Sequence, residues 1–474
     1  MGDHRDGRTF IERRMRILTP LRHRDFRLLW MGMTVSLLGD GIFYVSLAWQ
    51  AYELSNTPSA LSTIGVAMTV PHVVFLLAGG VVSDRFDRRR VMIAADLMRA
   101  LAVGVMGALA LSGRLELWHM VMLSGVFGAG TAFFGPAFDA IVPGLVPDDE
   151  LNQANSLDQL VRPAALRMLG PALGGWIVAT GGPGAAFVAD ACTFAISISC
   201  VALMRARRTS SEEPHASVIA DIREGFGYVR SQVWLWGTFL AATLGYLIFW
   251  GPSEVLLPFV VRNDLHGTAA DLGFIFAVGG IGAMTSAVVM GNRQMPRRNM
   301  TFIYVVWTAS TLAIAGYGLA RFPWQAMAAC FAFNALEGAG TIVWATTKGR
   351  LVPSRLLGRV SSFDWFISIA LVPISYAFTG PIADVFGAKQ TLVGAGLLGG
   401  VVTLAFLFLP GMRDIEGSDR LAGTPVDGTS DTGFGALEGP MAPISAGQGA
   451  FPSSGTLASG LRPPAAPSDI GKQT

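Results

Sequence analysis

Residues 59–112 read SALSTIGVAMTVPHVVFLLAGGVVSDRFDRRRVMIAADLMRALAVGVMGALALS, two long apolar runs joined by a short turn that carries four arginines. Each run is about 20 residues long, which is enough to cross a bilayer as an α-helix. Because lipid offers no hydrogen-bond partners, a spanning segment must satisfy its own backbone, and a helix does so. The pattern predicts a pair of membrane helices, near 59–82 and 91–112.

The same alternation continues along the whole chain. Of the 474 residues, 51% are apolar and 14% are charged, and the mean hydropathy is +0.48. A soluble domain has about a quarter charged residues, so this composition argues against one. We predict an all-α membrane protein with twelve transmembrane helices, near 28–51, 59–82, 91–112, 118–141, 157–179, 184–204, 233–260, 271–291, 300–320, 324–347, 360–383 and 390–410.

The two halves of the chain resemble each other. LVPDDELNQANSLD (145–158) aligns without gaps to LVPSRLLGRVSSFD (351–364) at an offset of 206 residues, and VVSDRFDRRRVM (81–92) aligns to VMGNRQMPRRNM (289–300) at nearly the same offset. In each aligned pair, the two segments lie at the corresponding connection between spans in their respective halves. Such a repeat is typical of secondary transporters and predicts two pseudo-symmetric six-helix bundles.

The segments before, between and after the spans alternate between the two sides of the membrane and so form two sets. These two sets differ in their number of Lys and Arg residues. The set that begins with the first 27 residues holds 24 Lys or Arg, and the other set holds 4. Basic residues favour the cytoplasmic side, so both termini are predicted to be cytoplasmic. The first apolar run is too long for a signal-peptide core and lacks a small-residue cleavage site, so we interpret it as a retained span in the cell membrane.

These boundaries predict five segments. They are a cytoplasmic N-terminal segment (1–27), an N-terminal bundle (28–204), a cytoplasmic linker (205–232), a C-terminal bundle (233–410) and a cytoplasmic tail (411–474). The linker contains an amphipathic piece, IADIREGFGYVR, expected along the membrane surface. The tail is rich in Gly, Pro and Ser, cannot bury a core and is expected to be disordered.

The turn after the second span carries the most specific motif, Gly80-Val-Val-Ser-Asp84-Arg85-Phe-Asp87-Arg88-Arg89. It resembles the signature Gly-x-x-x-Asp-Arg-x-Gly-Arg-Arg of the major facilitator superfamily, with Asp87 in place of the second Gly. The resemblance implies a cytoplasmic gate formed by Gly80, Asp84, Arg85, Arg88 and Arg89. Gly80 is expected to permit close helix approach.

Span 5 contains a second motif, Gly170-Pro171-Ala-Leu-Gly174-Gly175. It is similar to the core of the superfamily's antiporter motif, which belongs to exporters that exchange substrate for protons. Pro171 frees a backbone carbonyl, and the glycines permit a close crossing with another span. An upstream Gly of that motif is replaced by Leu166 here.

Further segments narrow the resemblance. Leu21-Arg-His-Arg-Asp-Phe26-Arg27, Gly39-Asp40 and Gly358-Arg359-Val-Ser-Ser362 are similar to the branch that contains macrolide-type multidrug exporters and the enterobactin exporter. The likeness covers residues 20–410. The arginine that drug antiporters often carry in span 4 is replaced by Ser124, so a proton relay through that arginine is not expected.

Ionisable residues inside apolar spans are costly and mark functional sites. Counted from the span ends, Asp40, Arg167 and Glu337 fall near mid-membrane and are predicted to carry proton coupling and to line the substrate cavity. Arg167 is predicted to pair with Asp40. Other ionisable residues nearer the span ends are interpreted as structural: Asp96, Arg99, Asp139, Asp158, Arg162, Asp190, Glu254 and Asp364.

Several motifs are absent, and with them several classes of function. There is no phosphate loop and no His-Glu-x-x-His pair, and the arginines form no soluble basic domain for nucleic acid. The three cysteines (Cys192, Cys200 and Cys330) are scattered through apolar runs and predict neither disulfides nor a metal site. We expect no enzyme activity, cofactor or bound metal.

The pattern as a whole predicts a secondary transporter that works by alternating access. It is expected to export hydrophobic or amphipathic small molecules against proton entry, acting as a monomer in the lipid bilayer. A siderophore or other narrow-specificity exporter and a proton-coupled importer remain alternatives. A membrane enzyme or sensor would need a polar domain, and the connection 205–230 is too short for one.

Overall fold

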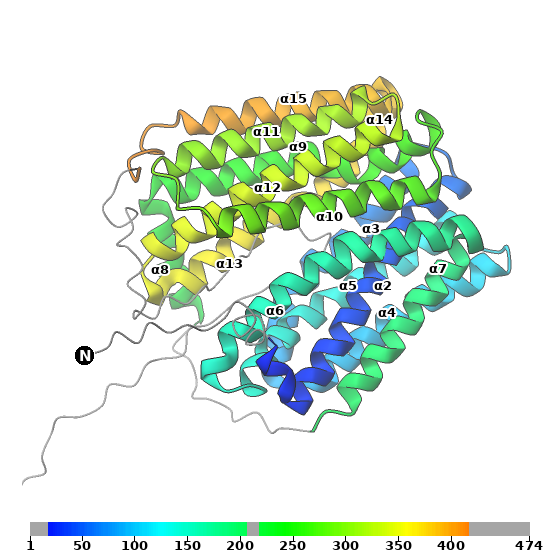
Figure 1. The fold of residues 1–474 in the computed structure, drawn as a ribbon, viewed down its shortest axis with the longest axis horizontal. Helices are drawn as coiled ribbons and strands as arrows, with labels where there is room; N and C mark the ends of the chain where they lie inside the picture. Colours follow the sequence, from blue (N-terminus) through cyan, green and yellow to red (C-terminus); the bar gives the residue numbers. More distant parts are fainter. Residues whose placement is uncertain (1–17, 206–217, 417–474) are drawn as a thin grey trace, which may run out of the picture.

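The computed structural model describes residues 18–205 and 218–416, and every regular element in these ranges is a helix (Figure 1). The all-α prediction is confirmed. In chain order the elements are η1 (Thr19–Arg22), α2 (Arg24–Leu54), α3 (Pro58–Arg85), α4 (Arg88–Leu111), α5 (Leu117–Ile141), η2 (Val142–Gly144), η3 (Asp148–Glu150), α6 (Leu151–Pro163), η4 (Ala164–Leu169), α7 (Gly170–Ala202), α8 (Val218–Ser231), α9 (Val233–Asn263), α10 (Ala269–Gly291), α11 (Asn299–Leu319), α12 (Pro323–Leu351), α13 (Ser354–Ala370), α14 (Val372–Phe386) and α15 (Ala388–Leu407).

Eleven continuous stretches of the described residues are long and apolar enough to cross a membrane. One of them has 52 residues and turns back at Gly182, where φ is +77°. Ahead of this turn Gly170 lies beside Gly41 of α2, whereas beyond it Cys200 has returned to lie beside Gly32 of α2. The stretch therefore crosses twice, and the predicted total of twelve spans is confirmed.

The crossings form two bundles, α2–α7 and α9–α15, which lie side by side in Figure 1. Spans 5 and 11 are both interrupted. In span 5 the interruption is η4, a turn of π-helix, and in span 11 it is the break at Leu371 between α13 and α14. The sequence repeat at an offset of 206 maps η4 onto residues 370–375, so the irregularity is shared by the two halves, as their pseudo-symmetry predicts.

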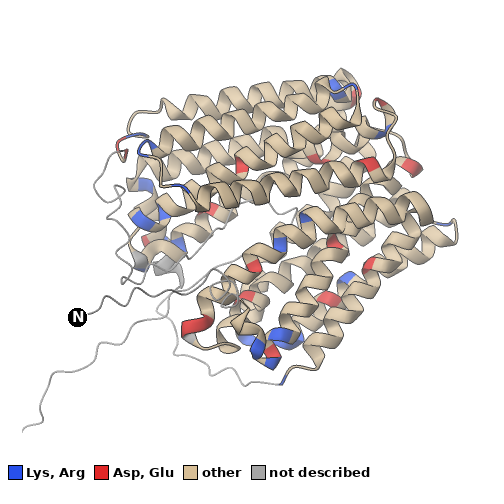
Figure 2. Cartoon of the chain, in the orientation of Figure 1, with Lys and Arg blue, Asp and Glu red and all other residues tan. Residues whose placement is uncertain are grey.

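The connections between spans lie at two ends of the molecule. We call one end the arginine-rich end; it holds the connections 86–87, 142–150, 292–298 and 352–353. The opposite end holds 55–57, 112–116, 264–268 and 320–322. Figure 2 shows that Lys and Arg gather on both bundles at the first of these ends.

The apolar core has a different form at the two ends. Toward the opposite end a single cluster of buried side chains runs through both bundles and includes Tyr52 and Ile64 together with Val255 and Val260. At the arginine-rich end the core is divided into two separate clusters. One contains Leu29 and belongs to the N-terminal bundle, and the other belongs to the C-terminal bundle. The bundles are therefore packed together at the opposite end.

Polar contacts between the bundles reinforce this packing at the opposite end. Tyr52 Oη donates to the carbonyl of Val255 at 2.6 Å, and Asn56 Nδ2 donates to Asn263 Oδ1 at 2.8 Å. Further contacts there join Ser62 to Tyr376 and Gly380, Ser59 to Asp384, and Arg262 to the carbonyl of Trp49.

The structure describes parts of two predicted polar segments, the linker and the tail. The amphipathic piece of the linker forms α8, which packs on α13: the rings of Phe226 and Phe363 are 6.2 Å apart, and Arg359 pairs with Glu224. Residues 411–416 were predicted to belong to a disordered tail, and this part of the prediction is wrong, because Met412 is fully buried in the C-terminal bundle. The rest of the tail, from residue 417, lies outside the described residues, as do residues 1–17.

Close packing of α2 on α7 generates the first prediction. A Cβ on Gly41 would lie 2.7 Å from the carbonyl oxygen of Leu166 and 2.8 Å from Gly170 Cα. Gly41→Ala is therefore expected to destabilise the protein by about 1–3 kcal/mol, the usual cost of overpacking, and to lower its melting temperature in detergent. Gly394→Ala on α15, where an added Cβ meets nothing within 4 Å, is the matched control. Equal melting temperatures for the two variants would contradict this close approach.

Candidate functional site

A cluster of charged residues lies inside the N-terminal bundle, between α2, α4 and α7. We call Asp40, Asp96, Arg99 and Asp190 the N-bundle cluster. Arg99 Nη2 donates to Asp96 Oδ1, and Arg99 Nη1 lies 3.6 Å from Asp40 Oδ2. Ser197 Oγ donates to Asp96 Oδ2 at 2.6 Å, so both oxygens of Asp96 have partners. All four charged residues are buried.

The neighbouring helices are shaped to hold the Arg99 side chain. Its guanidinium carbon lies 4.6 Å from the ring centroid of Phe134 on α5 and 4.6 Å from that of Phe194 on α7. A Cβ on Gly130 of α5 would lie 3.0 Å from Arg99 Cγ, so the glycine lets the Arg99 side chain pack closely against α5. Aromatic faces attract a cation that has lost its water, and they hold Arg99 in place between its carboxylates.

Asp190 has no cation of its own among these contacts. Its Oδ1 accepts a hydrogen bond from Thr193 Oγ1 at 3.1 Å, while its Oδ2 accepts none from the described residues. The carboxyl group lies directly against Gly39, the residue before Asp40, and the charges of Asp40 and Asp190 repel each other. Asp40 Oδ1 also accepts no hydrogen bond from the described residues.

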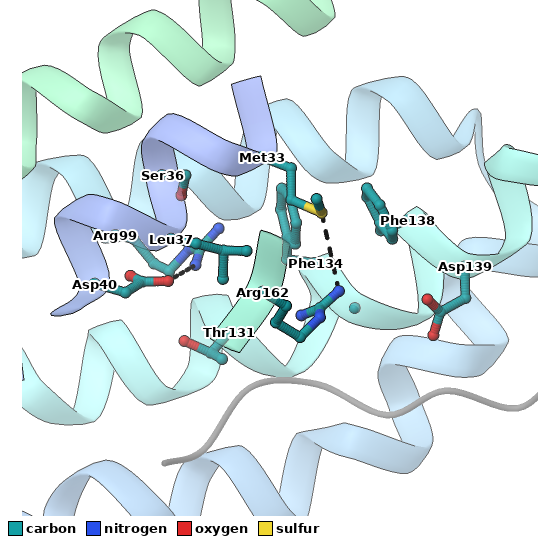
Figure 3. A pocket seen from close by; sticks show the side chains of 11 residues that line it. Met33, Ser36, Leu37, Asp40, Arg99, Thr131, Phe134, Phe138, Asp139 and Arg162 are labelled. Atoms are coloured by element: carbon teal, nitrogen blue, oxygen red, sulfur yellow. Dashed lines mark hydrogen bonds and ion pairs between the residues drawn. The ribbon is translucent and has the colours of Figure 1, made fainter. Parts of the chain in front are cut away.

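A small pocket lies between this cluster and the arginine-rich end of the N-terminal bundle (Figure 3). Asp40 and Arg99 lie in one part of it, and Phe138, Asp139 and Arg162 line another. Arg162 reaches back to Asp158 one turn earlier on α6, at 3.3 Å. The pocket places polar side chains along a path from Asp40 toward the arginine-rich end.

The predicted pairing of Arg167 with Asp40 is absent from this structure. Arg99 is the partner of Asp40, and Arg167 instead faces the other bundle, where its Nη1 donates to Asn334 Oδ1 at 3.4 Å. Arg167 lies on η4, whose wider turn rotates its side chains relative to those of a regular helix. The sequence does not indicate this turn of π-helix or the orientation that it gives Arg167.

A second charged group lies between the bundles, and we call Arg167, Glu254 and Glu337 the interface cluster. Arg167 attracts Glu254 of α9 and Glu337 of α12 electrostatically. Glu337 is only 4% exposed, and Thr341 Oγ1 donates to its Oε1 at 3.4 Å. The N-terminal bundle thus presents a cation to two carboxyl groups of the C-terminal bundle.

The residues of the predicted gate lie at the arginine-rich end. Arg88 Nη1 donates to the carbonyl of Ala140 at 2.6 Å, and Arg89 donates to the carbonyls of Val201 and Ala202, all in its own bundle. Arg85 is exposed in the last turn of α3.

The two remaining residues of the predicted gate are Gly80 and Asp84. The side chain of Asp84 is outside the described part of the structure. The expectation that Gly80 permits close approach is wrong, because a Cβ there would meet nothing within 4 Å. The neighbouring Gly79 makes that approach, against the backbone of α5 at Ala132.

The glycines of the span 5 motif face two different helices. Cβ atoms on Gly170 and Gly174 would lie 2.8 Å from Cα atoms of α2, those of Gly41 and Ile42. A Cβ on Gly175 would lie 2.6 Å from the carbonyl oxygen of Ala269 on α10. The motif therefore joins α7 to its own bundle on one side and to the C-terminal bundle on the other.

Asp96, Arg99, Asp190 and Glu254 were interpreted as structural because they were counted as near span ends. The structure corrects the depth of Arg99, which lies near the middle of the 24-residue α4. The spacing of Asp96 and Arg99 carried a usable signal, since residues three apart share a helix face. The sequence carries no such signal for Asp190, because its position beside Asp40 depends on how α7 turns back.

Two six-helix bundles that bury charged residues between their spans define a membrane transporter of the major facilitator superfamily, not an enzyme. The chain belongs to the family described as transmembrane secretion effector, which matches residues 16–437.

Comparisons with individual proteins agree with this family. The chain is 24% identical to macrolide efflux protein A of Streptococcus pyogenes over 79% of this chain and 93% of that protein. It is 26% identical to multidrug efflux pump Tap of Mycolicibacterium fortuitum over 80% and 94% of the two chains.

Solved structures show the same fold. A bacterial homologue of the iron transporter ferroportin in an inward-facing state has a TM-score of 0.61 and 14% identity, covering 82% of this chain and 99% of that one. A bacterial homologue of the human lysosomal transporter Spinster, inward-facing and unoccupied, has a TM-score of 0.58 and 15% identity, covering 82% and 95%.

The N-bundle cluster generates the second prediction. Arg99→Met is expected to destabilise the protein by about 3–5 kcal/mol, because removing one partner leaves buried carboxylates without a counter-charge. The double variant Asp96→Asn/Arg99→Met removes one charge of each sign and is expected to recover much of that loss. Melting temperatures in detergent measure both effects, with Arg85→Met at an exposed position as the control. A double variant as unstable as the single one would argue against the ion pair.

Proposed function

We propose that this chain exports hydrophobic or amphipathic small molecules by alternating access, driven by proton entry. The observation that carries the proposal is the asymmetry of the core, which is continuous between the bundles at the opposite end and divided at the arginine-rich end. A transporter that opens one end at a time needs this asymmetry. Relatives named as macrolide and multidrug efflux proteins support the export direction and the substrate class.

The orientation follows from the distribution of charge. Because basic residues favour the cytoplasmic side, we assign the arginine-rich end, and with it both termini, to the cytoplasm. The bundles are packed together at the outer end, so the present state is one in which substrate enters from the cytoplasm. Macrolides and other amphipathic drugs partition into membranes and cytoplasm, where such an opening receives them.

Proton coupling is assigned to the interface cluster, with Asp40 as a second acidic group. Glu337 can exchange a proton for an interaction with substrate as the two ends open in turn. Arg167 crosses from one bundle toward Glu254 and Glu337, so rearrangement of the bundles changes the electrostatic environment of both carboxyl groups. Protonation and conformation are coupled by that change.

The gate at the cytoplasmic end is assigned to Gly80, Asp84, Arg85, Arg88 and Arg89. Arg88 and Arg89 hold carbonyls at the ends of α5 and α7, so the motif keeps the N-terminal bundle rigid in the present state. When that end closes, the same charged turn meets the C-terminal bundle, where charge pairs across the halves stabilise the closed gate.

Alternating access generates the third prediction. In a background without native cysteines, Asn56→Cys/Asn263→Cys is expected to be cross-linked by a short bis-methanethiosulfonate reagent, because these two side chains meet between the bundles through their tips, at 2.8 Å. The cross-link should hold the outer end closed and abolish export of a fluorescent macrolide from cells, and a reductant should restore it. The matched control is Asn56→Cys alone. Unchanged export by the cross-linked protein would rule out opening at that end.

Proton coupling generates the fourth prediction. Glu337→Gln keeps the shape of the side chain but cannot carry a proton, so export driven by a pH gradient in proteoliposomes is expected to fall at least tenfold. Downhill exchange of substrate, which needs no proton, should persist. Gln325→Glu, at the outer end of the same helix α12, is a control for charge changes away from the cluster. If Glu337→Gln pumps normally against a gradient, Glu337 is not the proton carrier.

A further inference from the structure

The N-bundle cluster holds more carboxyl groups than its cations can balance. Among the described residues, Arg99 is the one guanidinium in direct contact with it, and it faces Asp40, Asp96 and Asp190. Asp96 takes one hydrogen bond from Arg99 and one from Ser197, which satisfies that carboxylate. Arg162 lies nearby but is engaged with Asp158. Arg99 also lies 3.6 Å from Asp40, so a single guanidinium faces three buried carboxyl groups. Uncompensated buried charge costs several kcal/mol, so the excess negative charge requires another positive charge.

The geometry identifies where that charge binds. Oδ1 of Asp40 and Oδ2 of Asp190 accept no hydrogen bond from the described residues, and the two side chains are 5% and 0% exposed. Both carboxyl groups lie at the level of Gly39 and Asp40 on α2, because α7 turns back at Gly182 and brings Asp190 against Gly39. Each of these two neighbouring carboxyl groups has one unpartnered oxygen, and their negative charges repel each other, so a small cation such as a proton is favoured there.

We propose that Asp40 and Asp190 share one bound proton, which makes the N-bundle cluster a second proton site, separate from Glu337. Two adjacent carboxyl groups that cannot both ionise hold a proton between them. The Arg99–Asp96 pair fixes the framework, and Thr193 orients Asp190 from the side. This inference rests on the proposed proton coupling, but the site itself is defined by proton binding alone.

The neighbouring residues and the adjoining pocket provide a route for this proton and the other charges that act on it. The groups that face it are Asp96 and Arg99 of α4, Tyr44 on α2 and Arg162 on α6, with Asp139 of α5 in the adjoining pocket. Asp40 lines that pocket, which runs toward the arginine-rich end, whereas Asp190 lies behind it. A proton from that end therefore reaches Asp40 first and is then shared with Asp190.

The test measures the proton directly, by infrared spectroscopy of the purified full-length protein. A protonated carboxyl group has a carbonyl band that shifts in deuterated water. Wild type is expected to show one such component at neutral pH that is lost in Asp190→Asn, because Asp40, Asp96 and Arg99 alone then carry the same net charge as the wild-type cluster with its proton. The component should persist in Glu337→Gln. Thr193→Val, which removes only a hydrogen bond to Asp190, should keep the component and move its frequency.

Each other outcome overturns the proposal. A component that survives Asp190→Asn, or is absent from wild type, shows that no proton is shared at this site. If replacing choline by sodium removes the component and raises the melting temperature, the cluster is a sodium site. Should Asp190→Asn fail to fold, the frequency change in Thr193→Val decides the question. Export is measured separately, so a wild type that exports nothing would remove the proposed function and leave the infrared result intact.

Discussion

Close backbone contact between helices is the constraint on which the rest of this structure depends. Lipid is as apolar as the side chains that face it, so burial of apolar surface alone does not drive helices together, and small residues must let the backbones meet. Gly41, Gly170 and Gly174 do this between α2 and α7, and Gly175 does it between α7 and α10. These contacts fix the depth of each helix relative to its neighbours. They thereby decide which polar side chains meet inside the bundle.

The two bundles contact each other mainly at one end of the molecule. Tyr52, Asn56 and Ser62 hold the C-terminal bundle at the end opposite the arginine-rich end, where the apolar core is shared. At the arginine-rich end each bundle closes its own core, and Arg88 and Arg89 bind carbonyls of their own half. Interruptions at η4 and Leu371 fall at equivalent places in spans 5 and 11. Helices broken at mid-membrane are typical of transporter sites, and here one of them carries Arg167.

Buried charge is divided between two places with different surroundings. The N-bundle cluster is enclosed by α2, α4, α5 and α7, and the aromatic rings of Phe134 and Phe194 cover its arginine. The interface cluster lies where the bundles meet, so any relative movement of the bundles alters it. The N-bundle cluster therefore has its neighbours within one bundle, whereas the interface cluster has neighbours in both.

The sequence by itself determined the number of spans, the two-bundle architecture and the family, because span length and repeated motifs are local properties of the chain. It also placed Asp40 and Glu337 correctly as buried acids. Only the tertiary structure decided their partners. Arg99 lies beside Asp40 and packs closely against Gly130 of α5, whereas Arg167 lies in a π turn and donates to Asn334 of the other bundle. Asp190 reaches Asp40 because the chain reverses at Gly182. Each of these meetings depends on the rotation and depth of separate helices, which are set by contacts between residues far apart in the chain.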